Sequence, residues 1–293
     1  MASTTANGIT IEYEIDGKGD SLLLVMGLAG QLIDWPDEFV TALIDEGFQV
    51  VRFDNRDSGL STEFDWTPPP QAKSALTMIT KRPGKAGYLI GDMAADAAGL
   101  LDALDIGSAH VAGVSMGGMI SQELAIGHSQ RVKSLTSIMS NTGDRRNGNP
   151  KAKLLAKLAR LQGDTRETAA DRGAELFGAI SGPGFDLEES RAECVLGVER
   201  SYRPDGTARQ TAAIMASPDR TDGLRRVTVP TLVVHGLVDP LVKPSGGMAT
   251  AKAVPGSRLV MYPDMGHNLP RTRWREIASA IRRNADRSGT TRS

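Results

Sequence analysis

Cysteine is nearly absent from this chain, which has a single one, Cys194, in 293 residues. One thiol cannot form an intrachain disulfide, so the sequence excludes a small disulfide-built scaffold. It also excludes a cluster of thiolate metal ligands, and the four histidines lack the spacing of a metal site. No phosphate-binding loop or dinucleotide fingerprint follows the first predicted strand. We therefore expect neither a metal nor a cofactor.

Net charge is also nearly absent, because 34 basic and 35 acidic side chains leave a formal charge of −1 at pH 7. This balance gives no electrostatic footprint for nucleic acid or anionic membranes. Arginines gather near the C-terminus, where we predict the solvent-facing side and last turns of a terminal helix, a place that favours cations. We expect no nucleic-acid partner.

Long apolar runs are missing as well, since none reaches the roughly 20 residues of a membrane-spanning helix. The N-terminal stretch MASTTANGITIEYEIDG has neither the basic region nor the apolar region of a signal peptide. We therefore expect a cytoplasmic protein that does not associate with membranes.

The chain does contain a series of short apolar, β-branched runs separated by helical patterns. Several runs are continuous rather than alternating, as in parallel strands that are covered on both faces. This pattern predicts an α/β fold with a doubly wound, mostly parallel sheet. The predicted strands span residues 9–15, 22–26, 49–53, 110–114, 134–139, 231–236 and 258–262.

The alternation of strands and helices stops between residues 142 and 230, where helical patterns, one of them over 151–162, occur without a convincing strand. We predict a core formed by residues 1–141 and 231–293, with 142–230 inserted as an all-helical cap (lid) over the carboxyl ends of the strands. A proline-bounded excursion over 67–88 is expected to hold a short helix. Four apolar cap residues are candidates either to face a pocket or to pack within the cap: Leu176, Phe177, Ile180 and Met215.

The pentapeptide GVSMG, with Ser115 at its centre, lies between a predicted strand and a helical pattern. A tight turn alone explains it, because glycine and serine are common turn residues. The alternative is a nucleophile elbow, in which a strained turn makes the serine hydroxyl project. The strand before it, the helix after it, and a base and an acid in the right order favour Ser115 as a nucleophile.

A nucleophilic serine needs a general base, for which histidine is best suited. His267 lies in a loop just after the last predicted strand, where its side chain can reach the carboxyl edge of the sheet. The other histidines have structural explanations: His110 opens the strand before Ser115 at its opposite end, His128 sits at a helix end, and His235 is expected to be a packed turn histidine.

The acid that orients the base should also follow the carboxyl end of a strand. Asp239 does so, and it lies between Ser115 and His267 in the chain. The alternative role for Asp239 is to cap the segment that follows it. Two backbone N–H groups should receive an oxyanion, and we predict those of Met116, at a helix N-terminus, and of Leu28, in the loop after the strand 22–26.

In this order the motifs LLLVMG, RFDNRDSGLST, VAGVSMGG, VPTLVVHGLVDPLV and MGHNLP resemble those of lipase/esterase-type α/β-hydrolases over essentially the whole chain. Within that superfamily the chain is similar to the aclacinomycin methylesterase-like branch, in which LLLVMG, WPDEF and D-x-R-D-x-G-x-S-T recur together. Met26 stands where many members carry histidine. In the RFDNRDSGLST motif, Asp54, Arg56 and Asp57 are expected to brace neighbouring loops rather than form a second site.

The sequence therefore predicts a serine hydrolase that cleaves small-molecule carboxylic esters through Ser115, His267 and Asp239 and an acyl-enzyme. Two alternatives use the same fold and residues: a cofactor-free, haloperoxidase-like perhydrolase and a carbon–carbon bond hydrolase. A third alternative is a ligand receptor that keeps the hydrolase scaffold without turnover. Dehalogenases and epoxide hydrolases are disfavoured because they need an aspartate where Ser115 stands.

Overall fold

The computed structural model describes residues 1–70, 84–151, 153–154 and 165–290. Most of the predicted excursion over 67–88 and most of the predicted helix over 151–162 lie outside the described residues. No helix within the described residues is long and apolar enough to cross a membrane.

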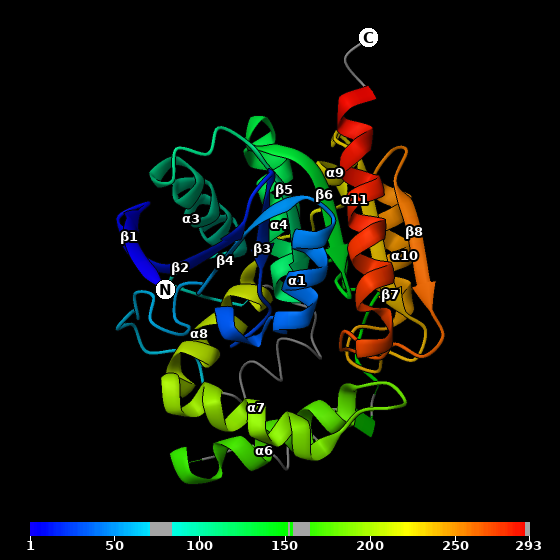
Figure 1. The fold of residues 1–293 in the computed structure, drawn as a ribbon. Helices are drawn as coiled ribbons and strands as arrows, with labels where there is room; N and C mark the ends of the chain where they lie inside the picture. Colours follow the sequence, from blue (N-terminus) through cyan, green and yellow to red (C-terminus); the bar gives the residue numbers. More distant parts are fainter. Residues whose placement is uncertain (71–83, 152, 155–164, 291–293) are drawn as a thin grey trace.

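One eight-stranded sheet forms the centre of the molecule (Figure 1), with the strand order β1-β2-β4-β3-β5-β6-β7-β8. β1 and β2, and β2 and β4, pair antiparallel, whereas the remaining neighbours are parallel. The prediction of a mostly parallel sheet is confirmed. In chain order the strands are Ala2–Ala6 (β1), Ile9–Gly17 (β2), Asp20–Val25 (β3), Phe48–Phe53 (β4), Ala109–Val114 (β5), Val132–Ile138 (β6), Thr231–Gly236 (β7) and Arg258–Tyr262 (β8).

All seven predicted strands are present, with ends that differ from the prediction by no more than two residues. The prediction missed β1, whose sequence ASTTA has almost no apolar residue because it is a largely exposed edge strand. A local signal for it does exist. Ala6 pairs with Ile9, so Asn7 and Gly8 form a two-residue hairpin turn, and both have positive φ, 50° and 78°. Asn-Gly is the typical sequence of such a turn.

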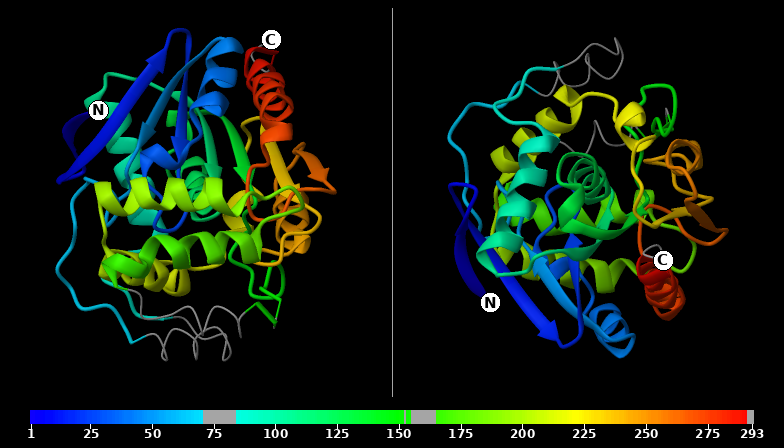
Figure 2. Two further views of the ribbon diagram at one scale, coloured as in Figure 1. Left: turned by 60° about the horizontal axis from the view of Figure 1, so that its bottom comes forward. Right: turned by 90° about the horizontal axis from the view of Figure 1, so that it is seen from above.

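Helices cover both faces of the sheet (Figures 1 and 2). On one face lie α1 (Asp37–Asp45) and α11 (Trp274–Thr290), and on the other α3 (Ile90–Ala103), α4 (Met116–Gly127) and α10 (Pro244–Ala253). The apolar run of β3 is continuous because alternate residues point to opposite faces of the sheet and both faces are buried. Its Leu22 and Leu24 pack towards α1 and α11, and its Leu23 and Val25 towards α3 and α4.

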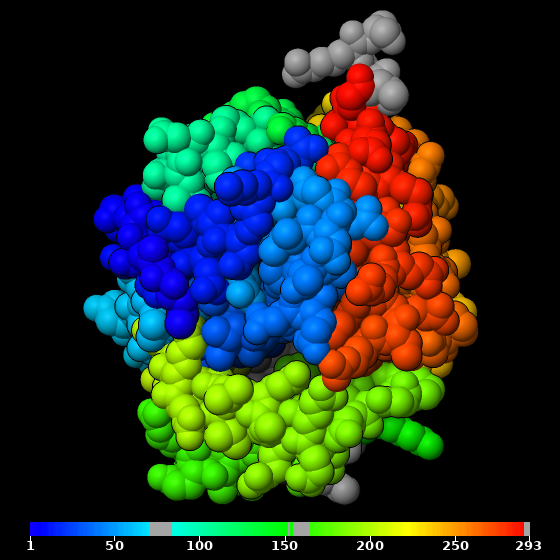
Figure 3. Space-filling view, viewed as in Figure 1, coloured from blue at the N-terminus to red at the C-terminus, as the bar shows by residue number. Residues whose placement is uncertain are grey.

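Between β6 and β7 the chain forms α6 (Arg166–Ile180), α7 (Leu187–Arg200), α8 (Pro204–Ala216) and the short α9 (Thr221–Leu224). No strand occurs in the described part of 142–230. α6 and α7 pack against each other and lie across the end of the sheet to which the parallel strands point (Figure 2). In space-filling view they form a layer against the lower edge of the core (Figure 3).

Candidate active site

Ser115 occupies the turn between β5 and α4, with φ 55° and ψ −118°. Positive φ is unfavourable for a residue with a side chain, so this turn is strained. Glycines permit the close contacts around it. A Cβ at Gly117 would lie 2.0 Å from the carbonyl oxygen of Val25 at the end of β3, and one at Gly113 would lie 2.2 Å from the carbonyl oxygen of Gly117. This geometry is that of a nucleophile elbow.

Three side chains from three loops meet at this turn in one line of hydrogen bonds. His267 Nε2 lies 2.9 Å from Ser115 Oγ, and His267 Nδ1 lies 2.7 Å from Asp239 Oδ2. The loops follow β5, β7 and β8, and parallel strands bring their carboxyl ends to one edge of the sheet. Such a line can move a proton from the hydroxyl to the imidazole while the carboxylate stabilises the imidazolium.

Asp239 is fully buried, and its two carboxylate oxygens have different partners. Oδ1 accepts hydrogen bonds from the N–H groups of Leu241 and Val242, at 2.8 and 2.9 Å. Oδ2 faces His267. One oxygen therefore holds the turn, which was the alternative role for Asp239, and this orients the other oxygen towards the imidazole.

The loop that carries His267 lies against the end of α6. The His267 N–H donates to the carbonyl oxygen of Ile180, at 2.7 Å. A Cβ at Gly266 would lie 2.4 Å from the Gly182 nitrogen, so only glycine allows this approach. The backbone of the chain between β6 and β7 is thus in direct contact with the His267 loop.

A second histidine, His235, also lies near Asp239 but does not bond to it. Its Nε2 is 3.7 Å from Asp239 Oδ2 and 2.8 Å from the carbonyl oxygen of Val242. Burial lowers the pKa of the His235 imidazole. A neutral ring that donates to Val242 supports the Asp239 turn without adding a charge. The prediction of a packed, hydrogen-bonded histidine is confirmed, but His235 lies near the end of β7 rather than in a turn.

The remaining two histidines lie away from Ser115. His110 is in β5 at the end remote from the elbow, with its Nδ1 2.9 Å from Ser134 Oγ, and burial lowers the pKa of His110 to about 4. His128 ends α4, where its N–H donates to the carbonyl oxygen of Leu124. Of the four histidines, the structure brings His267 to the serine hydroxyl.

The two predicted N–H donors also flank Ser115. Met116 is the first residue of α4, a position whose N–H has no acceptor within the helix. Leu28 lies in the turn after β3, next to Gly27, where a Cβ would be 3.3 Å from Ser115 Cβ. The loop that carries Leu28 therefore packs directly against the serine. The roles of both N–H groups stay predictions.

Side chains that the sequence did not single out hold the loop after β3. Asn55 Nδ2 donates to the carbonyl oxygen of Met26, at 3.0 Å, and Ser58 Oγ donates to that of Gly30, at 2.7 Å. Gln210, from α8, also contacts this loop. Asn55 and Ser58 lie in the recognised DNRDSG motif, but a glutamine in a polar helix gives no sequence signal.

Asp54, Arg56 and Asp57 brace loops, as predicted. Asp54 accepts a hydrogen bond from the Leu32 N–H at 2.7 Å, and Arg56 forms two hydrogen bonds with Asp96 at 2.6 and 2.7 Å. Asp57 is bonded to an arginine of α8. All three are buried and paired with protein groups, so they form a structural cluster.

The structure places the four apolar cap candidates differently. Ile180 is buried, and its carbonyl contacts the His267 loop; Leu176 and Met215 are half-buried. Phe177 is 44% exposed. Their role in a pocket stays a prediction, and Ile180 is the one whose backbone reaches the site.

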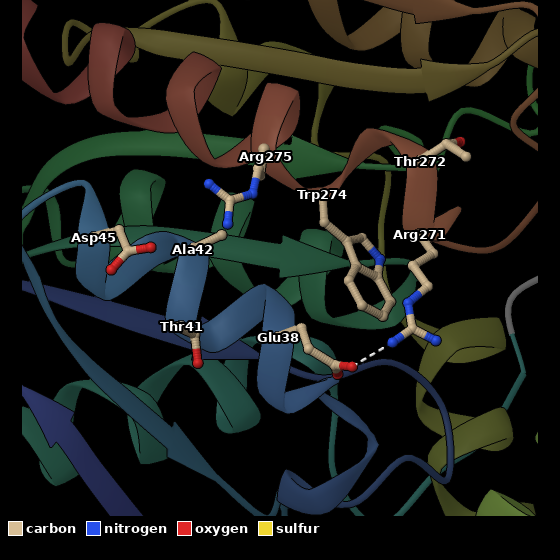
Figure 4. Close-up of a pocket in the computed structure, with 8 residues that line it drawn as sticks. All are labelled: Glu38, Thr41, Ala42, Asp45, Arg271, Thr272, Trp274 and Arg275. Atoms are coloured by element: carbon tan, nitrogen blue, oxygen red, sulfur yellow. Dashed lines mark hydrogen bonds and ion pairs between the residues drawn. The ribbon is translucent and has the colours of Figure 1, made fainter.

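A pocket of about 350 Å³ lies outside this site, between α1 and the start of α11 (Figure 4). Its lining includes an ion pair between Arg271 and Glu38, and none of Ser115, Asp239 and His267 takes part. The lining residues are Glu38, Thr41, Ala42, Asp45, Arg271, Thr272, Trp274 and Arg275.

Known proteins that are similar to this chain identify its family. Residues 20–270 match the family model described as the alpha/beta hydrolase fold. The chain belongs to this family. It is 29% identical over 291 residues to rhodomycin D methylesterase DnrP of Streptomyces peucetius, covering 91% of this chain and 92% of that protein. The expected resemblance to methylesterases is confirmed.

One further relative and one solved structure are also similar to this α/β-hydrolase. The bifunctional esterase/perhydrolase DCH of Acinetobacter calcoaceticus is 25% identical over 281 residues, covering 92% of this chain and 93% of that protein. The solved esterase of Exiguobacterium antarcticum superposes with a TM-score of 0.74 at 18% identity, covering 97% and 98% of the two chains. That likeness shows the fold alone.

Proposed function

We propose that this protein is a serine hydrolase that cleaves carboxylic esters through a covalent acyl-enzyme. The observation that carries the proposal is the continuous line from Ser115 Oγ through His267 to the buried Asp239 carboxylate, with bonds of 2.9 and 2.7 Å. The similarity to a methylesterase over nine-tenths of the chain supports an ester, and in particular a methyl ester, as substrate.

In the proposed reaction Ser115 Oγ attacks the ester carbonyl while His267 Nε2 takes the hydroxyl proton. Asp239 accepts the Nδ1 hydrogen bond, so it holds the imidazole in the correct tautomer and stabilises the imidazolium. His267 then gives the proton to the departing alcohol. Water, deprotonated by His267, attacks the acyl group and releases the acid and free Ser115. None of these reaction steps needs a cofactor.

The tetrahedral intermediate carries an oxyanion that needs donors in place before the reaction. We assign this role to the N–H groups of Met116 and Leu28. The position of Met116 at the N-terminus of α4, where the helix dipole favours negative charge, supports the first assignment. The packing of Gly27 against Ser115 supports the second.

A perhydrolase is the second candidate, favoured by the relative that is named both esterase and perhydrolase. It would use the same three residues, with hydrogen peroxide replacing water in the attack on the acyl-enzyme. Addition of peroxide to the assay, with the peracid measured as product, separates the two functions. Carbon–carbon bond cleavage is tested with a vinylogous diketone acid.

The decisive experiment is an ester panel: short-chain and long-chain p-nitrophenyl esters and methyl esters of bulky acids, each assayed with wild-type protein and Ser115→Ala. Loss of the covalent route should lower kcat by several orders of magnitude, while the unfolding temperature should change little, because the hydroxyl contributes little packing. Near-normal turnover in the variant, or no turnover of any ester by wild type, contradicts the proposal.

We also propose that residues 142–230 act as a cap that selects the acyl group, and that the protein is cytoplasmic. The contact between Ile180 and the His267 loop supports the first of these. Cell fractionation with a specific antibody tests the second.

A further inference from the structure

The cap helix α8 places a fully buried amide against the loop after β3. Gln210 is 0% exposed, and both ends of its amide are used. Oε1 accepts a hydrogen bond from the Ala29 N–H at 2.8 Å, and Nε2 donates to the carbonyl oxygen of Arg56 at 2.7 Å. A buried glutamine with both groups satisfied is held in one orientation, because rotation would leave a polar group unpaired.

The residue that Gln210 holds has an unfavourable backbone. Ala29 has φ 62°, in the left-handed region that is unfavourable for a residue with a Cβ. Ala29 directly follows Leu28, and the turn that contains both is closed by the bond from the Gly30 N–H to the Gly27 carbonyl oxygen, at 3.2 Å. Without an acceptor for the Ala29 N–H, the turn could relax, and the Leu28 N–H would change direction.

The helix that carries Gln210 is itself fixed on the core. Gly206, one turn earlier, lies so close to the core that a Cβ there would be 2.2 Å from the carbonyl oxygen of Asp57. Arg209 Nε bonds to the Asp57 carboxylate at 3.0 Å, and both side chains are buried. Because α8 is held against Asp57, the Gln210 side chain has a fixed position, and its hydrogen bond fixes the Ala29 N–H in turn.

From this geometry we propose that Gln210 is a positioning residue for the oxyanion site: its bond to the Ala29 N–H sets the direction of the Leu28 N–H. The inference rests on the proposed ester hydrolysis and deepens it. The cap then has two roles, because α8 completes the site that the core builds while the rest of the cap covers it.

The test compares Gln210→Met with Gln122→Met. Gln122 is also 0% exposed and makes two side-chain hydrogen bonds, to Ser137 and Arg220, neither of which belongs to the loop after β3. Q210M should lower kcat about 10- to 100-fold with KM changed less than threefold, since a misdirected donor weakens binding of the transition state only. The inhibition constant of a trifluoromethyl ketone, whose serine adduct carries an oxyanion, should rise by the same factor. Q122M should lose stability but keep kcat and this inhibition constant.

Gln210→Glu keeps an acceptor for the Ala29 N–H but, when ionised, loses the donor to the Arg56 carbonyl oxygen, so it should lose less kcat than Q210M. Equal loss of kcat in Q210E and Q210M, or wild-type kcat and inhibition in Q210M, overturns the inference. If Q210M does not fold, Q210E and hydrogen exchange of wild type decide: rapid exchange of the Ala29 amide also overturns it. Wild-type turnover that Ser115→Ala abolishes shows that the proposed function stands even where Gln210 has no role.

Discussion

The helices that pack on the sheet and the helix α7 of the proposed cap differ in how much of their surface they bury. In the core, α4 buries most of its length, including Ile120 and Leu124, against the sheet. In the cap, α7 buries only Ser190 among its fourteen residues. The helix α8 does add Ala213 to the apolar core, but polar contacts also join residues 142–230 to the core, such as the half-buried Arg200 with Asp54 at 2.8 Å and the buried Arg209 with Asp57 at 3.0 Å.

Apolar packing and buried ion pairs are suited to different structural requirements. Apolar packing is dense and tolerates no shift, which suits the residues that must keep Ser115, His267 and Asp239 in line. Buried ion pairs depend on direction as well as distance, so they specify where the cap sits relative to the core. In the proposed mechanism the core supplies the reacting groups, and buried charge pairs help to place the proposed cap on the core.

The largest expected effect tests the core alone. His267→Gln should lower kcat at least a thousandfold, because the proton of Ser115 loses its acceptor. His235→Gln, at the other histidine near Asp239, should stay within about tenfold, since it supports the turn through Val242 and not the serine. Steady-state kinetics on one ester measures both. An indispensable His235 beside a dispensable His267 would reverse the assignment.

The next effect tests the polar attachment of the cap. Arg209→Met removes hydrogen bonds to Asp57, Glu63 and the Trp66 carbonyl and leaves Asp57 buried without its cationic partner. We expect a loss of about 3–5 kcal/mol in the free energy of unfolding, measured by urea denaturation.

The matched control is Arg191→Met, which removes an ion pair with Asp171 between two cap side chains that are each about half exposed, 52% and 54%. Surface pairs contribute little, so its urea midpoint should stay at the wild-type value. Equal losses in the two variants would mean that buried pairing does not hold the cap.

The stability of the core should depend on pH through the buried His110. The pKa of His110 is lowered by burial to about 4 from its usual 6.5, so between these values the unfolded chain binds a proton that the folded protein does not. His110 therefore does not reduce the free energy of unfolding above about pH 6.5. Below that pH the free energy of unfolding decreases, because the unfolded chain takes up the proton. From pH 7 to 4.5, wild type should lose roughly 2–3 kcal/mol more than His110→Gln in the free energy of unfolding.

Urea unfolding at the two pH values measures this difference, with His128→Gln, at the half-buried end of α4, as the control for losing a histidine. If the His110→Gln variant has the same pH dependence as wild type, His110 is not the group that titrates.

The smallest expected effect tests selection by the cap. Ile180→Ala should change the ranking among acyl groups by about 1–3 kcal/mol, taken from ratios of kcat/KM, while turnover of the best ester persists. Phe177→Ala, at a side chain that is 44% exposed, should leave the ranking closer to wild type. A ranking unaffected by Ile180→Ala would remove Ile180 from the acyl pocket.

Much of this protein could be predicted from local sequence. Continuous apolar runs such as Leu22–Val25 indicated parallel strands because burial on both faces leaves no polar positions. G-x-S-x-G indicated the elbow because only glycine allows the contacts at Gly113 and Gly117. His267 and Asp239 followed from chain order and from the rule that the carboxyl ends of parallel strands share one edge. β1 was missed because a polar edge strand carries no apolar pattern.

What only the tertiary structure decided are contacts between segments far apart in the chain. Gln210 and Ala29 are separated by 181 residues, and nothing near either of them indicates that their polar groups meet. The same holds for Arg209 and Asp57, 152 residues apart. Local composition determines which faces are buried, because burial follows the periodicity of each element. The partner of a buried polar group is set by how whole elements dock, and no local pattern records that.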